Sequence, residues 1–238
     1  MIIPGNMKIS GFLKTTLLDW DGKVACTIYL AGCNFRCPYC HNHSLVLTPD
    51  KTDDLPLDEI LDYIERNSDF LDGVVISGGE PTLNKDLPGL IKRLRKLGMK
   101  IKIDTNGTRP DMLDDLIGAG MVDFVAMDVK APLDGRYSAV TGVEADVSDI
   151  RRSIRIIMES GVDYEFRTTV VPVLLKPEDM EDIFRDIRGA KRYRLHQFRP
   201  VSCLDENFTV LDPYPESVLV EMGEKAKKYV KDVRIRGI

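Results

Sequence analysis

Three cysteines, Cys33, Cys37 and Cys40, stand within eight residues of the chain, and two more lie at positions 26 and 203. An odd total with three crowded together is a poor disulfide framework and a better pattern for binding metal in a reducing compartment. Soft thiolate ligands suit iron–sulfur clusters, and a four-iron cluster held by three cysteines leaves one iron open to another ligand. The spacing by itself predicts a three-thiolate site.

Three other interpretations of these cysteines remain open. A structural zinc site would take His41 as a fourth ligand beside the three thiolates. The segment CPYCH at 37–41 also matches the signature of c-type haem attachment, which requires an exported protein and leaves Cys33 unexplained. A thioredoxin-like dithiol would need a helix that opens at Cys37, where Pro38 and a third cysteine fit poorly.

Short apolar runs alternate with amphipathic helical stretches from about residue 24 onward. The expected strands are Val24 to Leu30, Gly73 to Ile76, Lys100 to Asp104, Val122 to Val129, Tyr164 to Val171 and Tyr193 to Phe198. The expected helices lie near 57–67, 86–97, 111–119, 149–160, 177–188 and 214–231, and Pro177 is expected to open the fifth of them. Because helical crossovers imply parallel pairing, the pattern predicts an α/β fold, either a partial (β/α)6 barrel or a doubly wound open sheet.

The 238 residues are expected to form a single domain, with an N-terminal arm at 1–22, a barrel core at 23–200 and a C-terminal helix and tail at 201–238. The net charge is −5 and charges of both signs are interleaved, which argues against a nucleic-acid partner. The N-terminal residues lack a signal-peptide pattern, and no run approaches the ~18 apolar residues of a membrane span. We expect a cytoplasmic protein without a membrane partner.

Polar motifs follow several expected strands at their carboxyl ends, the rim where parallel α/β folds build sites. Ser77 to Pro81 reads SGGEP, Asp104 to Gly107 reads DTNG, and Asp128 and Lys130 lie at the end of the fourth strand. Paired glycines and Asn-Gly also occur in ordinary turns, and charged residues after a strand are often merely solvated. Only their shared position at strand ends favours a common site.

Four further residues lie outside these motifs: Cys26, Arg167, His196 and Cys203. An arginine in a parallel strand, Arg167, must find an anion or line a polar cavity. His196 at the end of the sixth strand is as consistent with a packed or hydrogen-bonded structural residue as with a functional one. Cys26 is expected in the core, and Cys203 is either inert or near the active site.

The C-x-x-x-C-x-x-C spacing with Tyr39 before the last cysteine resembles the signature of the radical S-adenosylmethionine (SAM) superfamily. The resemblance implies that Cys33, Cys37 and Cys40 ligate one 4Fe-4S cluster. It further implies that the amino and carboxylate groups of SAM chelate the fourth iron, and that Tyr39 lies beside the adenine.

The later motifs resemble SAM-binding segments of the same superfamily. The resemblance implies that Gly78, Gly79 and Glu80 receive the SAM amino group. It also implies that Asp104, Thr105 and Asn106 lie near the methionyl group, as in the activating-enzyme branch. The remaining residues expected to contact SAM are Asp128, Lys130, Arg167 and His196. For Arg167 we expect a contact with the carboxylate or the ribose.

Segments 19–23, 32–42 and 197–200 extend the resemblance to glycyl-radical-enzyme activating enzymes, of the anaerobic ribonucleoside-triphosphate reductase and pyruvate formate-lyase types. This resemblance implies that flavodoxin or ferredoxin reduces the cluster, that SAM is cleaved, and that the 5′-deoxyadenosyl radical removes a hydrogen from a glycine of a partner enzyme. A second cluster is not expected, because only Cys203 follows Cys40.

Two other classes of function stay open at this point. In the first, a radical SAM enzyme acts on a small molecule, nucleoside or peptide. In the second, the chain is a metal-binding or redox module without SAM chemistry.

Overall fold

The computed structural model describes residues 7–238, so the first six residues of the expected N-terminal arm lie outside it. Its strands are β1 (Ile9–Thr16), β2 (Ala25–Leu30), β3 (Gly73–Gly78), β4 (Lys100–Thr105), β5 (Phe124–Asp128), β6 (Asp163–Val170), β7 (Arg192–Gln197) and β8 (Asp232–Arg236). They form an eight-stranded sheet in the order β1-β2-β3-β4-β5-β6-β7-β8.

The helices alternate with these strands. The α-helices are α1 (His43–Leu47), α2 (Leu57–Arg66), α3 (Leu87–Lys96), α4 (Pro110–Gly118), α5 (Arg136–Thr141), α6 (Val147–Glu159), α7 (Met180–Asp186) and α8 (Glu216–Ala226). Short 3-10 helices are η1 (Pro49–Lys51), η2 (Pro81–Leu83) and η3 (Glu206–Val210). Among residues 7–238, none of the helices is both long and apolar enough to cross a bilayer.

The chain divides into two compact units. The first contains the described residues up to Asn34, Ser44–Thr105 and Asp111–Val125, and the second contains Phe35–His43, Asn106–Pro110 and Ala126–Ile238. The expectation that 1–238 form one domain stays a prediction.

Three parallel strands make the centre of the first unit. β2 pairs with β3 and β3 with β4, so that Cys26, Val74 and Ile101 lie side by side. All three are fully buried, as expected for parallel strands with apolar runs. β1 runs antiparallel to β2, and the amphipathic helices α2 and α3 each bury an apolar face.

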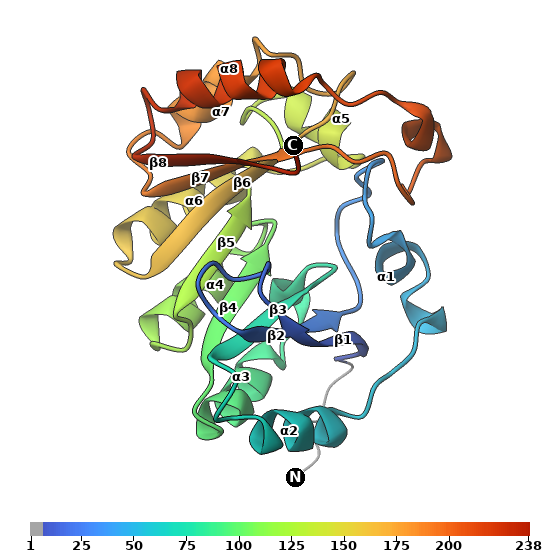
Figure 1. The fold of residues 1–238 in the computed structure, drawn as a ribbon, viewed down its shortest axis with the longest axis vertical. Helices are drawn as coiled ribbons and strands as arrows, with labels where there is room; N and C mark the ends of the chain where they lie inside the picture. Colours follow the sequence, from blue (N-terminus) through green and yellow to red (C-terminus); the bar gives the residue numbers. More distant parts are fainter. Residues whose placement is uncertain (1–6) are drawn as a thin grey trace. The chain divides into compact units, whose positions relative to one another are not determined.

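The second unit contains the parallel strands β6, β7 and β8. Figure 1 shows α7 and α8 lying along one side of β7 and β8. Phe184 of α7 packs edge-to-face on Tyr193 of β7, with ring centroids 5.7 Å apart. Gly223 of α8 lies against Ile235, where an added Cβ would stand 3.1 Å from the Ile235 Cδ1. These contacts hold β8 at the end of the sheet.

The six expected strands are confirmed as β2 to β7, with ends within two residues of the expectation. The expectation that Pro177 opens a helix is wrong, because α7 begins at Met180. The Asp179 carboxylate accepts the N–H of Lys176, so these residues form a separate turn before the helix. β1 and β8 are additional strands; β8 reads DVRIR, in which charged residues interrupt the apolar signal of a strand.

Arg194 of β7 is buried and joins the second unit's three strands. Its Nη2 lies 2.9 Å from the Asp232 carboxylate on β8, and its Nε lies 3.4 Å from the Glu165 carboxylate on β6. Removing one partner of a buried ion pair leaves an uncompensated charge behind.

We therefore expect Arg194→Ala to lower the free energy of unfolding by about 3–5 kcal/mol, measured by urea denaturation. Arg192→Ala is the matched control, because Arg192 lies on the same strand and pairs with Asp163 at the surface. That variant should lose no more than about 1 kcal/mol. Equal losses in the two variants would contradict the structural role given to Arg194.

Candidate active site

The cysteine loop, residues 33–40, carries three thiols, and hydrogen bonds from other segments hold its backbone in place. Cys33, Cys37 and Cys40 are thiols in the structure, not disulfides. Within the loop, the Cys40 N–H donates to the Cys37 carbonyl at 3.0 Å, which closes a turn. The Asp205 N–H donates to the Pro38 carbonyl at 2.9 Å, so the segment after β7 is fastened to this turn.

A second attachment comes from the end of α5. The Arg36 N–H donates to the Thr141 carbonyl at 2.8 Å. Gly142, which follows with φ of 70°, packs so tightly that an added Cβ would lie 2.3 Å from the Arg36 carbonyl oxygen. Sequence analysis missed this pair, although a glycine after a short helix is a recognisable cap signal.

Both histidines that follow Cys40 contact the segment after β7. His41 Nε2 lies 2.9 Å from the Arg199 carbonyl, and His43 Nε2 lies 3.1 Å from the Ser202 hydroxyl. A ring nitrogen that bonds to a carbonyl is the protonated one, so Nδ1 is the nitrogen of His41 that keeps a lone pair in this arrangement. These two contacts attach the residues after Cys40 to the segment after β7.

The Gly78–Gly79 pair lies directly against the backbone that leads into Cys33. The Gly79 and Glu80 N–H groups donate to the carbonyls of Leu30 and Gly32, at 2.9 and 2.8 Å. An added Cβ on Gly79 would lie 1.9 Å from the Gly32 oxygen. The glycines are therefore required by a close approach of two backbones, which is more than an ordinary turn demands.

The Glu80 carboxylate is buried and fixed by threonines. Its Oε1 accepts hydrogen bonds from the Thr105 hydroxyl at 2.7 Å, from the Thr82 N–H at 3.1 Å and from the Thr82 hydroxyl. Glu80 is the N-cap of η2, with Pro81 in the first position of that helix. Sequence analysis missed Thr82, although an acidic residue followed by proline is a typical helix start.

Asp104, at the end of β4, lies in a polar environment of the first unit. The Ser77 hydroxyl donates to Asp104 Oδ2 at 3.2 Å, and the Lys102 ammonium lies 3.4 Å from Oδ1. Asp104 is thus held between a hydroxyl and a buried cation that sequence analysis did not single out.

Asn106 and Gly107 follow β4 as a tight turn. The Asn106 Oδ1 accepts from the Thr108 N–H and hydroxyl, at 3.0 and 2.7 Å. Gly107 has φ of 77°, and an added Cβ would clash with Met127. The turn interpretation of these two residues is confirmed, while a SAM contact by Asn106 stays a prediction.

In the second unit, Asp128 binds two cations at once. Arg167 Nε donates to its Oδ1 and Lys130 Nζ to its Oδ2, each at 2.8 Å. Burial alone would raise the pKa of Asp128, but the two cations outweigh it and hold that pKa well below its usual range. Arg167 thus has the anion that sequence analysis required, and one carboxylate with two cations leaves the group net positive.

This charged group lies beside the cysteine loop. Burial raises the pKa of the Cys40 thiol and of the Tyr39 phenol, and the Lys130 ammonium opposes both shifts. Tyr39 is buried, and its hydroxyl has no hydrogen-bond partner among residues 7–238. Lys130 therefore lies within electrostatic reach of the loop.

The other residues considered from the sequence lie at different places. Cys26 is fully buried in β2, as expected of a core residue. Cys203 is buried as well, and burial followed by the nearby Cys40 raises the pKa of its thiol. His196 is half-buried on β7, between Thr169 and Arg236 in the strand register.

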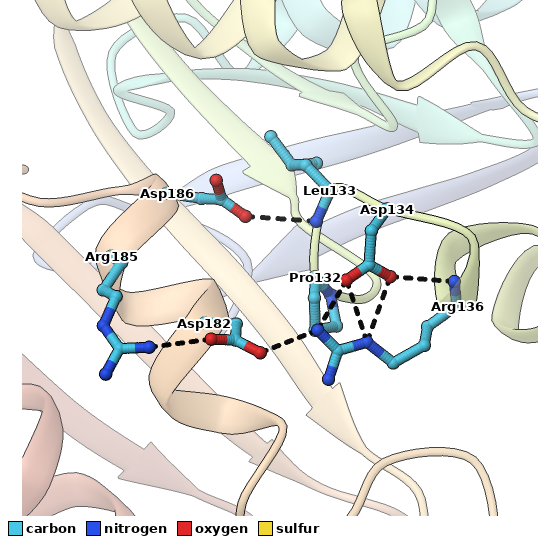
Figure 2. Close-up of a pocket in the computed structure, with 7 residues that line it drawn as sticks. All are labelled: Pro132, Leu133, Asp134, Arg136, Asp182, Arg185 and Asp186. Atoms are coloured by element: carbon cyan, nitrogen blue, oxygen red, sulfur yellow. Dashed lines mark hydrogen bonds and ion pairs between the residues drawn. The ribbon is translucent and has the colours of Figure 1, made fainter.

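A separate cavity of about 290 Å³ lies between the loop after β5 and helix α7. Figure 2 shows that its charged side chains point toward one another. Its lining residues are Pro132, Leu133, Asp134, Arg136, Asp182, Arg185 and Asp186. Arg136 bridges Asp134 and Asp182, and Asp186 accepts the Leu133 N–H, so these groups satisfy one another. We assign this cavity a structural role.

The structure brings the residues predicted from the sequence into two groups. In the first unit, Gly78, Gly79, Glu80 and Thr105 lie together alongside the backbone before Cys33, and Asp104 follows on β4. In the second unit, the members are Cys37, Tyr39, Cys40, Asp128, Lys130 and Arg167.

Comparison with known proteins gives a consistent result. A family model described as the radical SAM superfamily matches residues 27–188. A Methanocaldococcus jannaschii protein named “Putative glycyl-radical enzyme activating enzyme” is 39% identical over 235 residues, covering 97% of this chain and 96% of that protein. The pyruvate formate-lyase-activating enzyme of Clostridium pasteurianum is 25% identical over 237 residues, covering 91% and 94%.

Solved structures agree on the fold. Streptococcus suis SuiB bound to S-adenosylmethionine is similar with a TM-score of 0.68 and 15% sequence identity. The match covers 86% of this chain and 48% of SuiB, so this chain spans about half the length of that protein. Together with the strand order, this likeness confirms the α/β class and, of the two expected alternatives, the partial barrel.

The contact between Gly79 and Gly32 predicts a large effect of a single methyl group. Gly79→Ala places a Cβ against a backbone oxygen that no side-chain movement can relieve, so we expect a lower melting temperature and less iron bound per chain after anaerobic reconstitution. Gly89→Ala is the matched control, because nothing lies within 4 Å of its Cβ in helix α3. That variant should be neutral or stabilised. Normal iron binding by Gly79→Ala would contradict the close approach.

Proposed function

We propose, from the premise that this chain belongs to the radical SAM superfamily, that it installs a glycyl radical on a partner enzyme. Members of this superfamily use a 4Fe-4S cluster and SAM, and these are the cofactors of the chain. The proposal rests on the 39% identity to the M. jannaschii relative, which extends over 97% of the chain.

The cysteine loop has a donor set that fits the cluster. Cys33, Cys37 and Cys40 would supply three thiolates, which leaves one iron for the amino and carboxylate groups of SAM. The attachments of the loop to α5 and to the segment after β7 would hold the thiols in place. The proposal assigns no cluster to Cys26 or Cys203.

The motifs at the strand ends would bind SAM. In the first unit, Gly78, Gly79 and Glu80 would receive the amino group, with Glu80 fixed by Thr82 and Thr105. Asp104, Thr105 and Asn106 would lie near the methionyl group. In the second unit, the net positive group of Asp128, Lys130 and Arg167 would bind the carboxylate or ribose of SAM. Tyr39 would lie beside the adenine, and His196 would contact SAM from the end of its strand.

The cofactors supply the chemistry when bound, as a 5′-deoxyadenosyl radical that abstracts hydrogen. The residues of this chain bind and orient SAM and exclude water around it. The burial of Tyr39 and the fixing of the ionised Asp128 by two cations are suited to that task. The protein substrate would be a glycyl-radical enzyme, and flavodoxin or ferredoxin would donate the electron.

The test combines the anaerobically reconstituted chain, SAM and a low-potential reductant with pyruvate formate-lyase or an anaerobic ribonucleotide reductase. We expect the doublet signal of a glycyl radical in the partner by electron paramagnetic resonance, with 5′-deoxyadenosine formed in proportion. Partner protein with its radical-bearing glycine changed to alanine should give no signal.

Two negative results carry different meanings. If SAM is cleaved but no candidate partner gains a radical, the proposal fails in favour of an enzyme that acts on a small molecule, nucleoside or peptide. If the cluster forms without any release of 5′-deoxyadenosine, a redox module without SAM chemistry is the better description.

A further inference from the structure

Lys102 of β4 is a buried cation for which the proposed function has no use. It is 3% exposed, although lysine is almost never fully buried unless its ammonium is paired. Lys100, two residues earlier on the same strand, is exposed. The burial of Lys102 therefore needs a specific explanation.

The Lys102 ammonium contacts oxygen atoms of the first unit. It donates a hydrogen bond to the backbone carbonyl of Asp19, and it lies 3.4 Å from the Oδ1 of Asp104. It also lies over the Phe124 ring, 5.6 Å from the centroid. The contact with Asp19 uses the backbone, whereas the contact with Asp104 pairs this charge with a carboxylate.

The position of Lys102 in the sheet explains how it reaches Asp104. Residues two apart on a strand point to the same face, so Lys102 stands one step before Asp104 along β4. In the strand register Lys102 lies beside Val75, which packs with Trp20. Lys102 thus lies between an apolar cluster and the carboxylate at the end of the strand.

We propose that Lys102 is a positioning residue that holds the Asp104 carboxylate in the correct orientation for SAM. The Ser77 hydroxyl donates a hydrogen bond to Oδ2, and the Lys102 ammonium lies at ion-pair distance, 3.4 Å, from Oδ1. A carboxylate whose orientation is already fixed binds SAM without the entropic cost of ordering its side chain. This inference rests on the proposed SAM contact of Asp104.

The informative variant is Lys102→Gln, which removes the charge while keeping a donor for the Asp19 carbonyl. We expect it to weaken SAM binding by about 10-fold, measured by anaerobic equilibrium dialysis with the reconstituted protein. Iron content should be unchanged, because Lys102 has no contact with the cysteine loop among the interactions described above. Lys100→Gln is the matched control and should bind SAM normally, and Lys102→Arg should retain most of the affinity.

The double variant with Asp104→Asn decides whether Lys102 acts through Asp104. The proposal expects Asp104→Asn to weaken SAM binding, and Lys102→Gln to add nothing further in that background. Equal effects of Lys102→Gln in both backgrounds would overturn it, as would normal SAM affinity in Lys102→Gln. If Lys102→Gln fails to fold, Lys102→Met is tested in the same cycle.

Failure of this inference is separable from failure of the proposed function. Should Asp104→Asn bind SAM normally, the role of Lys102 falls together with the SAM contact of Asp104. The glycyl-radical proposal is unaffected by that result, because the binding assay contains no partner enzyme.

Discussion

The close approach of the Gly78–Gly79 backbone to Leu30–Gly32 is the constraint on which the candidate residues of the first unit depend. Two backbone hydrogen bonds and the absence of a side chain on Gly79 allow these segments to touch. Cys33 follows one segment and Glu80 follows the other, so the contact fixes the spacing between a proposed cluster ligand and a proposed SAM ligand. The glycines therefore act through the backbone, and the carboxylate that follows them is oriented by threonine donors.

A different principle organises the candidate residues of the second unit. Asp128 is shared by Lys130 and Arg167, and the resulting positive group lies within electrostatic reach of the cysteine loop. Buried charges of this kind are stable only when they are paired, and here the pairing leaves one positive charge in excess. Such a group is suited to a ligand that carries a carboxylate, as SAM does. The buried Arg194 serves the fold instead, because its carboxylate partners join neighbouring strands.

Sequence patterns predicted the parts of this structure that depend on local signals. Apolar runs located β2 to β7, and the order of motifs at strand ends placed Glu80, Asp104 and Asp128 correctly at the ends of their strands or just beyond. Sequence patterns failed where a contact joins residues distant in sequence or where the local signal is weak. The Arg36 N–H bonds to the Thr141 carbonyl across more than a hundred residues, β8 is short and charged, and Lys102 belongs to no motif. The sequence indicated that the backbone at Gly78 and Gly79 could approach another group closely, but a glycine pair does not reveal which backbone approaches it.

Three of the five thiols are expected to hold one cluster. The iron and sulfide content of single alanine variants after anaerobic reconstitution identifies them. We expect Cys33→Ala, Cys37→Ala and Cys40→Ala each to lose the 4Fe-4S cluster, and Cys26→Ala and Cys203→Ala to retain it. Cys203 is the sharpest control, because its thiol is buried and lies near Cys40. Retention of the cluster by any of the first three variants, or its loss from Cys203→Ala, would show that Cys33, Cys37 and Cys40 are not the ligand set.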